Sequence, residues 1–365
     1  MLRAYKYRLY PTEAQALFFV KTIGCTRFIY NRLLADRIAI YEATKQNPGI
    51  KQKFPTPASY KPEFPFLREA DSLALANANL NLNEAFEKFF TGSGGFPKFK
   101  TKRHSRASYT TNNQHGTVRI EGEKIRLPKI GFVRFKQHRL FHGLIRSATI
   151  SMTRTRKFFV SLLILEQEIE SAPGNHLVGI DLGLQHFAIL TNDNLVTKKV
   201  INPRFFRKSE EKIKRAQRAM SRKKVGSKNR EKARLILAKK HEKIANQRND
   251  FLHKLSKSIV DENQVIVIET LKPKNMIQDS HLAKSISDAS WSEFIRQLKY
   301  KATFYGRTLI TADQWFASTQ ICSCCGKDDG QKPLGVRTWT CSSCGADHDR
   351  DVNASINLLL LAKNH

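Results

Sequence analysis

The sequence predicts a multidomain α+β protein with a small N-terminal β-barrel, a helical segment inserted into that barrel, and a C-terminal α/β domain. Three observations indicate this organisation. Strand-like runs lie on both sides of a long helical stretch, as expected for a barrel with an insertion. Continuous apolar runs alternate with helical segments farther along, which is typical of buried strands in an α/β sheet. Two C-x-x-C pairs near the C-terminus indicate a separate module.

The N-terminal part of the chain alternates between strand and helix patterns. Residues 1–10 alternate as a strand does, and the segment from Thr12 to about Phe90 is helical apart from a proline-rich loop at 47–66. Pro11 opens the helical part, and Thr12 is the expected N-cap. After the helix ends near Gly92, short strands are expected at Thr117–Ile120, Lys124–Leu127, Phe132–Phe135, Ala148–Met152 and Phe158–Leu165.

The C-terminal part of the chain predicts an α/β domain. Residues 176–193 read as a buried strand, a glycine-containing turn and a second strand, and residues 264–270 (QVIVIET) read as another buried strand. Residues 204–258 are helical, and the break at Val225-Gly226-Ser227 indicates a helical hairpin. Three further elements are expected: a helix that starts at the capping box Ser290-x-x-Glu293 and runs through Ala302, a strand at Arg307–Thr311, and a last short helix at Val352–Ala362.

Net charge identifies the class of partner. The chain holds 63 Lys and Arg against 32 Asp and Glu, a formal net charge of +31 over 365 residues. Such an excess attracts polyanions, so nucleic acid is the expected partner. No apolar run reaches the roughly 18–20 residues that a spanning helix needs, and the N-terminus MLRAYKYRLYP lacks the apolar core of a signal peptide. We therefore expect no membrane partner and a cytoplasmic location, where the six cysteines stay reduced.

The cysteines form a pattern typical of a structural zinc site. Fifteen residues separate two C-x-x-C knuckles, and each knuckle is followed by a glycine that gives the turn its conformational freedom. Four thiolates at this spacing complete one tetrahedral zinc site, whereas a redox dithiol is the alternative reading. Cys324 is a spare thiol inside the first knuckle, and Cys25 is an ordinary buried thiol on an apolar helix. The predicted zinc ligands are Cys322, Cys325, Cys341 and Cys344.

Three acidic residues occupy unusual places. Asp181 lies within the apolar run VGIDLG, and Glu269 ends the apolar run VIVIE. A carboxylate at a buried strand usually has a metal or cation partner, although a strand-end glutamate can also be purely structural. Asp351 lies at the start of the last helix, where the helix dipole favours an anion and a simple N-cap is the alternative. Asp347 and Asp349 share its alternating phase and are rivals for its role.

The order of these features resembles a known family. An Asp on a first strand, a Glu after a later strand and an Asp at a final helix, with a cysteine module before the last, resemble the three motifs of a RuvC-type nuclease. Together with the N-terminal motifs they resemble the transposon-encoded TnpB family and the related type V CRISPR effectors. The segments that carry the resemblance are YRLYPTEAQ (7–15), RFIYNRLL (27–34), GFPKFK (95–100), GIDLG (179–183), FLHKL (251–255), IETLKPKNM (268–276), SISDASWSEFIRQLKYKA (285–302) and RTWTCSSCGADHDRDVNASIN (337–357).

The resemblance implies a division into four parts. An RNase H-like (RuvC) α/β nuclease domain is interrupted by a zinc finger, and a wedge β-barrel of OB-like type is interrupted by a helical recognition lobe. The implied bounds are 1–11 and 93–171 for the wedge barrel, 12–92 for the recognition lobe, 172–317 and 346–365 for the nuclease domain, and 318–345 for the zinc finger.

The resemblance also implies an activity, that of a magnesium-dependent DNA endonuclease that hydrolyses phosphodiester bonds. Asp181, Glu269 and Asp351 take the three catalytic, metal-binding roles, and the D-x-N-A match selects Asp351 over its two neighbours. Two Mg²⁺ ions about 4 Å apart, which Mn²⁺ can replace, would clamp the scissile phosphate. One structural Zn²⁺ would occupy the cysteines.

In the family a guide RNA from the transposon end reads the target, which is double-stranded DNA beside a short transposon-adjacent motif, with one protein for each RNA. The implied location is the prokaryotic cytoplasm or nucleoid. Lys272–Asp288 resembles a lid that gates the site. The residues expected to contact nucleic acid are Arg350, Lys98 and Lys100 for phosphates, and Ser72, Leu73, Ala76, Asn77, Tyr109, Thr110, Thr111 and Asn112 near the motif.

Three other functions compete with this reading. A nuclease-inactive, RNA-guided regulator would share the architecture but typically loses one of the acids or the C-terminal end. A transposase with a nucleophilic tyrosine would need a nearby His pair, which Tyr5, Tyr7 and Tyr10 lack. A zinc protein that binds nucleic acid without a guide would need no carboxylates in strands. The retained acids favour the nuclease.

Overall fold

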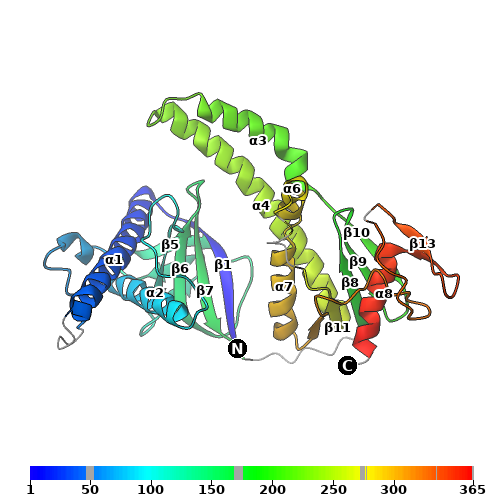
Figure 1. The fold of residues 1–365 in the computed structure, drawn as a ribbon. Coiled ribbons are helices and arrows are strands. Elements are labelled where there is room, and N and C mark those ends of the chain that lie inside the picture. The colour runs from blue at the N-terminus through cyan, green and yellow to red at the C-terminus, as the bar shows by residue number, and fades with distance from the viewer. Residues whose placement is uncertain (47–52, 168–175, 272–275, 277, 334, 364–365) are drawn as a thin grey trace. The chain divides into compact units, whose positions relative to one another are not determined.

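The chain folds into two compact units, Met1–Glu168 and Ile169–His365. The computed structural model describes residues 1–46, 53–167, 176–271, 276, 278–333 and 335–363. Figure 1 shows helices and strands in both units, so the fold is multidomain α+β as predicted. No helix among the described residues combines the length and the apolar character needed to cross a membrane.

Unit 1 is built on one seven-stranded antiparallel sheet. Its strand order is β2-β6-β7-β1-β5-β4-β3. The strands are β1 (Leu2–Tyr10), β2 (Ser108–Asn112), β3 (Arg119–Glu121), β4 (Lys124–Leu127), β5 (Gly131–Lys136), β6 (Leu144–Met152) and β7 (Phe158–Leu165). Among the described residues β2 and β3 do not pair with each other, so the predicted small barrel takes the form of an open half-barrel sheet.

Two long helices pack against this sheet. Helix α1 (Glu13–Gln46) begins after Thr12, whose Oγ1 accepts from the N–H of Gln15 at 3.3 Å, while the N–H of Thr12 donates to Oε1 of Gln15 at 3.1 Å. This reciprocal pair is a capping box, which confirms Thr12 as the N-cap. A short 3-10 helix η1 (Pro65–Arg68) precedes helix α2 (Ser72–Phe90), which Asp71 caps. Both helices therefore lie between β1 and β2 in the chain, as the predicted insertion requires.

Unit 2 is built on a five-stranded mixed sheet of order β10-β9-β8-β11-β12. Strands β8 (His176–Leu182), β9 (His186–Asn192) and β10 (Thr197–Ile201) form an antiparallel meander. Strand β11 (Asn263–Ile268) then runs parallel to both β8 and β12 (Thr308–Thr311). The parallel pairs bring the carboxyl ends of β8, β11 and β12 to one edge of the sheet.

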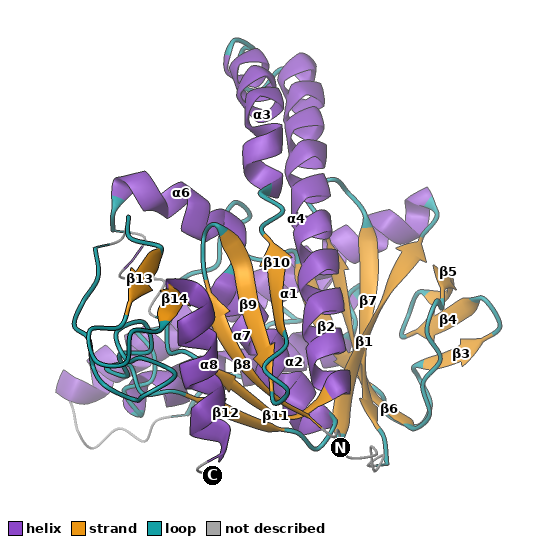
Figure 2. Ribbon diagram, turned by 90° about the vertical axis from the view of Figure 1, so that its right-hand side faces the viewer, coloured by secondary structure: helices purple, strands orange, loops and turns teal. Residues whose placement is uncertain are grey.

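The helices of unit 2 are α3 (Phe205–Ser221), α4 (Lys228–Glu262), α6 (Ser280–Ala289), α7 (Trp291–Phe304) and α8 (Arg350–Lys363). Helices α3 and α4 extend together beyond the sheet in both views (Figure 2). The hydroxyl of Ser227 caps α4 through the N–H of Arg230, and Gly226 adopts a φ of +83° in the turn. The predicted helical hairpin is thereby confirmed.

The start of α7 differs from the prediction. Ser290 has a φ of +58°, and its hydroxyl donates to the carbonyl of Ser287 rather than accepting from the helix. The Glu293 carboxylate bonds the side chains of Arg296 and Gln297. The capping box was therefore wrong, although the helix itself is present. The lid predicted at Lys272–Asp288 contains most of α6, while 272–275 and 277 lie outside the described residues.

Candidate active site and metal centre

Asp181 and Glu269 lie side by side at the carboxyl ends of two paired strands. Ile180 of β8 is the partner of Ile268 of β11, so the next residue of each strand is one of the two acids. The backbone N–H of Leu182 donates to Oε1 of Glu269 at 2.9 Å and fixes the orientation of that carboxylate. The apolar residues on both strands are buried, which is why each acid sits at the rim of a core rather than in open solvent.

Helix α8 delivers Asp351 to the same edge. The helix packs on β8 at Gly179, where an added Cβ would lie 2.1 Å from the carbonyl oxygen of Ser355 and 2.5 Å from the amide nitrogen of Leu359. Only glycine permits this close approach of two backbones. Gly179, the first glycine of VGIDLG, thus sets the distance between the strand that holds Asp181 and the helix that holds Asp351. Sequence reasoning used the acid of this motif and missed the packing role of its glycine.

The two rivals of Asp351 have other roles. Oδ1 of Asp349 accepts from the N–H groups of Asp351 and Val352 at 3.1 and 3.2 Å, and so caps α8. Its other oxygen forms an ion pair with Lys199 of β10 at 2.6 Å. Asp347 is exposed and accepts from the hydroxyl of Thr340 at 2.5 Å. Asp351 is therefore the acid of this segment whose charge reaches Asp181.

The acids repel one another in a buried place. Burial raises the pKa of Asp181 well above its usual range, and the charges of Glu269 and Asp351 raise it further. Arg350 and Arg337 have a smaller, opposite effect on this pKa. Burial raises the pKa of Glu269 to about 7, and Asp351 adds to this, although the Leu182 N–H opposes it. Neighbouring carboxylates that are removed from water favour bound cations, and oxygen donors suit hard divalent ions.

Two arginines already contact Asp351. Nη1 of Arg337 lies 3.0 Å from one of its carboxylate oxygens, and Nε of Arg350 lies 3.2 Å from the other. Arg350 is 8% exposed, and its Nη1 donates to the carbonyl of Pro333 at 3.4 Å. The phosphate contact of Arg350 stays a prediction, and in the structure its guanidinium faces Asp351. Arg337, half-exposed, is a cation that sequence reasoning passed over.

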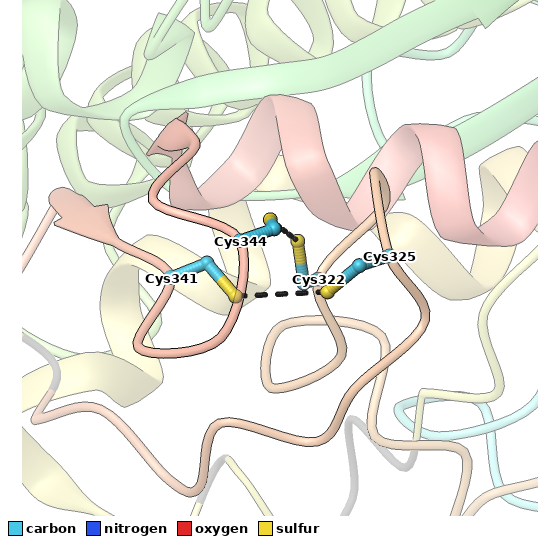
Figure 3. Close-up of side chains that lie close together, drawn as sticks. All are labelled: Cys322, Cys325, Cys341 and Cys344. Carbon is cyan, nitrogen blue, oxygen red and sulfur yellow. Dashed lines mark hydrogen bonds between the residues drawn. The ribbon is translucent and has the colours of Figure 1, made fainter.

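The four predicted cysteine ligands converge on one point (Figure 3). The Sγ atoms of Cys322 and Cys344 lie 3.7 Å apart, and those of Cys325 and Cys341 also lie 3.7 Å apart. Tetrahedral zinc with Zn–S bonds of about 2.3 Å needs sulfurs about 3.8 Å apart, whereas a disulfide needs about 2.05 Å. All four Sγ atoms lie within 4.8 Å of one another, so the cluster can hold one tetrahedral ion.

The knuckles have the backbone geometry that metal binding needs. Gly326 and Gly345 adopt φ values of +76° and +71°, and each donates its N–H to the carbonyl of the first cysteine of its knuckle. Backbone N–H groups of Cys344 and Ser343 lower the pKa of Cys341 to about 7, which favours the thiolate. These features belong to the cysteine module, by which we mean residues 318–333 and 335–349.

Sequence reasoning missed one member of this cluster. Nε2 of His348 lies 3.0 Å from Sγ of Cys322, and the imidazole packs on the ring of Trp339 with centroids 4.6 Å apart. His348 is buried, whereas Cys324 is exposed. Cys322, Cys324 and His348 form a second group of possible ligands, which the C-x-x-C spacing alone does not reveal.

Unit 1 has a cavity of about 170 Å³ between α1, α2 and β2. Asn77 of α2 lines it, and its Nδ2 lies 3.5 Å from Oδ1 of Asn112 on β2, so two of the predicted motif contacts touch each other. Ser72 and Ala76 are exposed on α2, and Leu73 is half-buried. The cavity is also lined by Arg27, Asn81, Arg106, Tyr109 and Thr110.

Two of the predicted contacts on β2 point into the core. The burial of this strand alternates, with Tyr109 and Thr111 buried and Thr110 and Asn112 half-exposed. Thr111 is 0% exposed and therefore cannot reach DNA without rearrangement. Lys98 is exposed, as a phosphate contact requires. Lys100 is half-buried, with its Nζ 3.6 Å from the ring centroid of Tyr30, and burial lowers its pKa.

Comparison with known proteins identifies the family. Residues 161–279 match the family described as "Probable transposase" (OrfB_IS605), and residues 291–358 match the "Cas12f1-like, TNB domain". A Streptomyces pristinaespiralis protein named "Putative RNA-guided DNA endonuclease" is 38% identical over 98% of this chain and 88% of its own length. The chain belongs to the TnpB family. An Escherichia coli K12 relative of the same name, InsQ, is 30% identical over 98% of this chain and 92% of its own.

The fold agrees with this membership of the TnpB family. The structure entitled "Cryo-EM structure of the Cas12f1-sgRNA-target DNA complex" matches 95% of this chain and 82% of that chain, with a TM-score of 0.60 and 14% sequence identity. At this identity the match shows a shared multidomain fold. The family match described as "Helix-turn-helix domain" covers residues 1–46, which here form strand β1 and the single helix α1.

Proposed function

We propose that this chain is an RNA-guided DNA endonuclease that cuts double-stranded DNA next to a short transposon-adjacent motif, with a guide RNA from the transposon end. The observation that carries the proposal is the meeting of Asp181, Glu269 and Asp351 at one sheet edge, from segments 170 residues apart in sequence. The names of the full-length relatives support the same activity. The strand order of unit 2, an antiparallel meander followed by two parallel strands, is that expected of an RNase H-like nuclease.

Asp181, Glu269 and Asp351 would hold two Mg²⁺ ions, or Mn²⁺ in their place. When bound, the ions supply a hydroxide nucleophile and stabilise the leaving oxygen of the scissile phosphate. Leu182 holds the Glu269 carboxylate through its N–H, so that one oxygen is fixed and the other is left for an ion. Asp349 and Lys199 hold the first turn of α8 in place and thereby orient Asp351.

The cysteine cluster would hold one structural Zn²⁺. Its support is the sulfur geometry, with two Sγ–Sγ distances of 3.7 Å that fit a tetrahedral ion and exclude disulfides. His348 beside Cys322 suits the outer hydrogen bond that metal-bound thiolates commonly receive. Cys324 is exposed and is left outside the four-sulfur site.

The cavity of unit 1 would read the motif beside the target. Amide and guanidinium groups at Asn77, Asn81 and Arg27 line it, and these groups suit base edges, an amide pairing with adenine and a guanidinium with guanine. The overall charge of +31 suits the many phosphates of a guide RNA and its target.

The proposal is tested with the chain co-expressed with its own transposon-end locus. RNA that co-purifies is sequenced, and the particle is offered a plasmid library with randomised flanks and Mg²⁺. Asp181→Ala removes the central acid, and Asp261→Asn is the matched control, because Asp261 is an exposed acid paired with Lys257 on α4. We expect guide-dependent cutting behind one flank, lost only with Asp181→Ala.

Two results would decide against the nuclease. A bound RNA that directs target binding without cutting would identify a nuclease-inactive regulator. Cutting that survives Asp181→Ala would place the chemistry elsewhere in the chain.

A further inference from the structure

Two buried asparagines tie the cysteine module to helix α8. Asn353 and Asn357 lie one helical turn apart and are 1% and 4% exposed. Nδ2 of Asn357 donates to the carbonyls of Ser318 and Ile321 at 2.8 and 2.6 Å. Both asparagines belong to the segment DVNASIN, and the nuclease chemistry proposed above uses neither of them.

Asn353 makes a two-way contact with the first knuckle. Its Nδ2 donates to the carbonyl of Ile321 at 2.7 Å, and its Oδ1 accepts from the N–H of Ser323 at 2.8 Å. Ile321 and Ser323 flank Cys322, one of the four sulfur ligands. The asparagine amide donates through Nδ2 and accepts through Oδ1 at the same time, so the contact fixes both sides of that ligand.

The second knuckle reaches α8 by another route. Strands β13 (Thr338–Thr340) and β14 (Asp347–Asp349) pair on either side of it, and β14 continues directly into α8. The N–H of Arg350 donates to the carbonyl of Arg337 at 2.8 Å, while the Arg337 side chain contacts Asp351 at 3.0 Å. The two knuckles therefore hold the first turns of α8 from two sides, and Asp351 lies in the first of those turns.

We propose that Asn353 and Asn357 are positioning residues that couple ion binding by the four cysteines to the placement of Asp351. An ion at the sulfurs fixes the knuckle carbonyls and amides, the two asparagines fix α8 against them, and the rigid helix holds Asp351 toward Asp181. Loss of the ion, or of the asparagines, leaves Asp351 loosely placed and weakens divalent-ion binding at the acids. The inference rests on the proposed function, because it assumes that the acids bind divalent ions.

The test measures Mn²⁺ affinity of the full chain from the EPR signal of free Mn²⁺. Asn353→Leu and Asn357→Leu keep the branched shape and the number of side-chain heavy atoms but remove the hydrogen bonds, and zinc is counted by atomic emission. We expect both variants to keep one zinc per chain and to bind Mn²⁺ roughly 10-fold more weakly, at the low end of the loss caused by outer-shell partners of a metal, because the asparagines act on Asp351 only through the helix. Zinc removal from the unsubstituted chain should give the same loss, and zinc addition should reverse it.

Two controls separate positioning from general destabilisation. Ile244→Ala removes a buried side chain from α4, outside the core cluster that flanks Asp181 and Glu269, and should leave Mn²⁺ affinity unchanged. Ser343→Ala changes an exposed hydroxyl of the second knuckle and should also have no effect. Unchanged Mn²⁺ affinity in both asparagine variants overturns the coupling, and so does an equal loss in Ile244→Ala. Failure of the unsubstituted chain to bind Mn²⁺ through Asp181 overturns the proposed function itself.

Discussion

Replacing Glu269 with glutamine is expected to stabilise the ion-free protein while abolishing cleavage. Burial and Asp351 raise the pKa of Glu269 from 4.5 to about 7, so the charged carboxylate destabilises the folded state. At pH 7 this difference corresponds to about 3 kcal/mol of folding free energy. Glutamine removes the charge and keeps an oxygen that can accept from the N–H of Leu182. The gain should appear as a rise of roughly 6–12 °C in melting temperature, at about 2–4 °C per kcal/mol.

The sign of the pH dependence follows from the raised pKa. The free-energy cost of the charged Glu269 carboxylate is fully present when the pH is above its pKa in the folded state, about 7. This cost disappears when the pH falls below 4.5, its pKa in the unfolded state. The advantage of Glu269→Gln should therefore shrink to about 1 kcal/mol at pH 5. Added Mg²⁺ should stabilise the unsubstituted chain at pH 7 and have little effect on the variant, because the ion compensates a charge that the variant lacks.

The assay can report on unit 2 alone. The three tryptophans of the chain are Trp291, Trp315 and Trp339, so intrinsic fluorescence follows unfolding of that unit. Melting is recorded in EDTA and in MgCl₂ at pH 5 and pH 7. Glu262→Gln is the matched control, an exposed glutamate at the end of α4 whose oxygen accepts from the Ser258 hydroxyl. If Glu269→Gln melts no higher than the unsubstituted chain in EDTA at pH 7, the argument that burial and Asp351 make the charged Glu269 destabilising is refuted.

Three further substitutions test other parts of the structure. Gly179→Ala should lower the free energy of unfolding by about 1–3 kcal/mol and slow cleavage, because its Cβ would meet the α8 backbone. Unfolding is followed by tryptophan fluorescence. The control Gly335→Ala should change neither property, because there is open space around Gly335. Cys325→Ser should lose the bound zinc in a metal count, and retention of one zinc per chain would disprove the four-sulfur site. Asn77→Ala should relax the preferred flanking motif at one position in a randomised-flank library, and an unchanged motif would exclude this cavity as its reader.

Much of the fold could be predicted because its strands carry strong apolar patterns. Strands β4 and β7 lie where alternation and flanking turns placed them. Strand β2 was missed as a strand, since its sequence SYTTN buries a tyrosine and a threonine between hydroxyl and amide side chains and gives little apolar contrast. The capping box at Ser290 failed because the residue adopts a left-handed conformation, a choice that the motif alone does not reveal.

The sequence alone identified the candidate residues of the active site and of the cysteine module, but not all of their roles. Asp347, Asp349 and Asp351 share one alternating phase, and a family motif had to select the last. The physical distinction comes from Lys199, 150 residues away, which pairs with Asp349. The contact of His348 with Cys322 was likewise hidden, because it depends on how the knuckle folds back on β14.

The central position of β1 in the first sheet has a consequence for synthesis of the protein. Arg8 donates to the carbonyl of Phe158 across 150 residues of sequence, and β7 covers one side of β1 along almost its whole length. At about 5–20 residues per second, a ribosome needs on the order of 10–30 s to make the missing partner. During that interval Tyr7 and Leu9, both buried in the finished sheet, have no core to enter. We therefore expect the nascent chain to depend on chaperones until β7 has emerged.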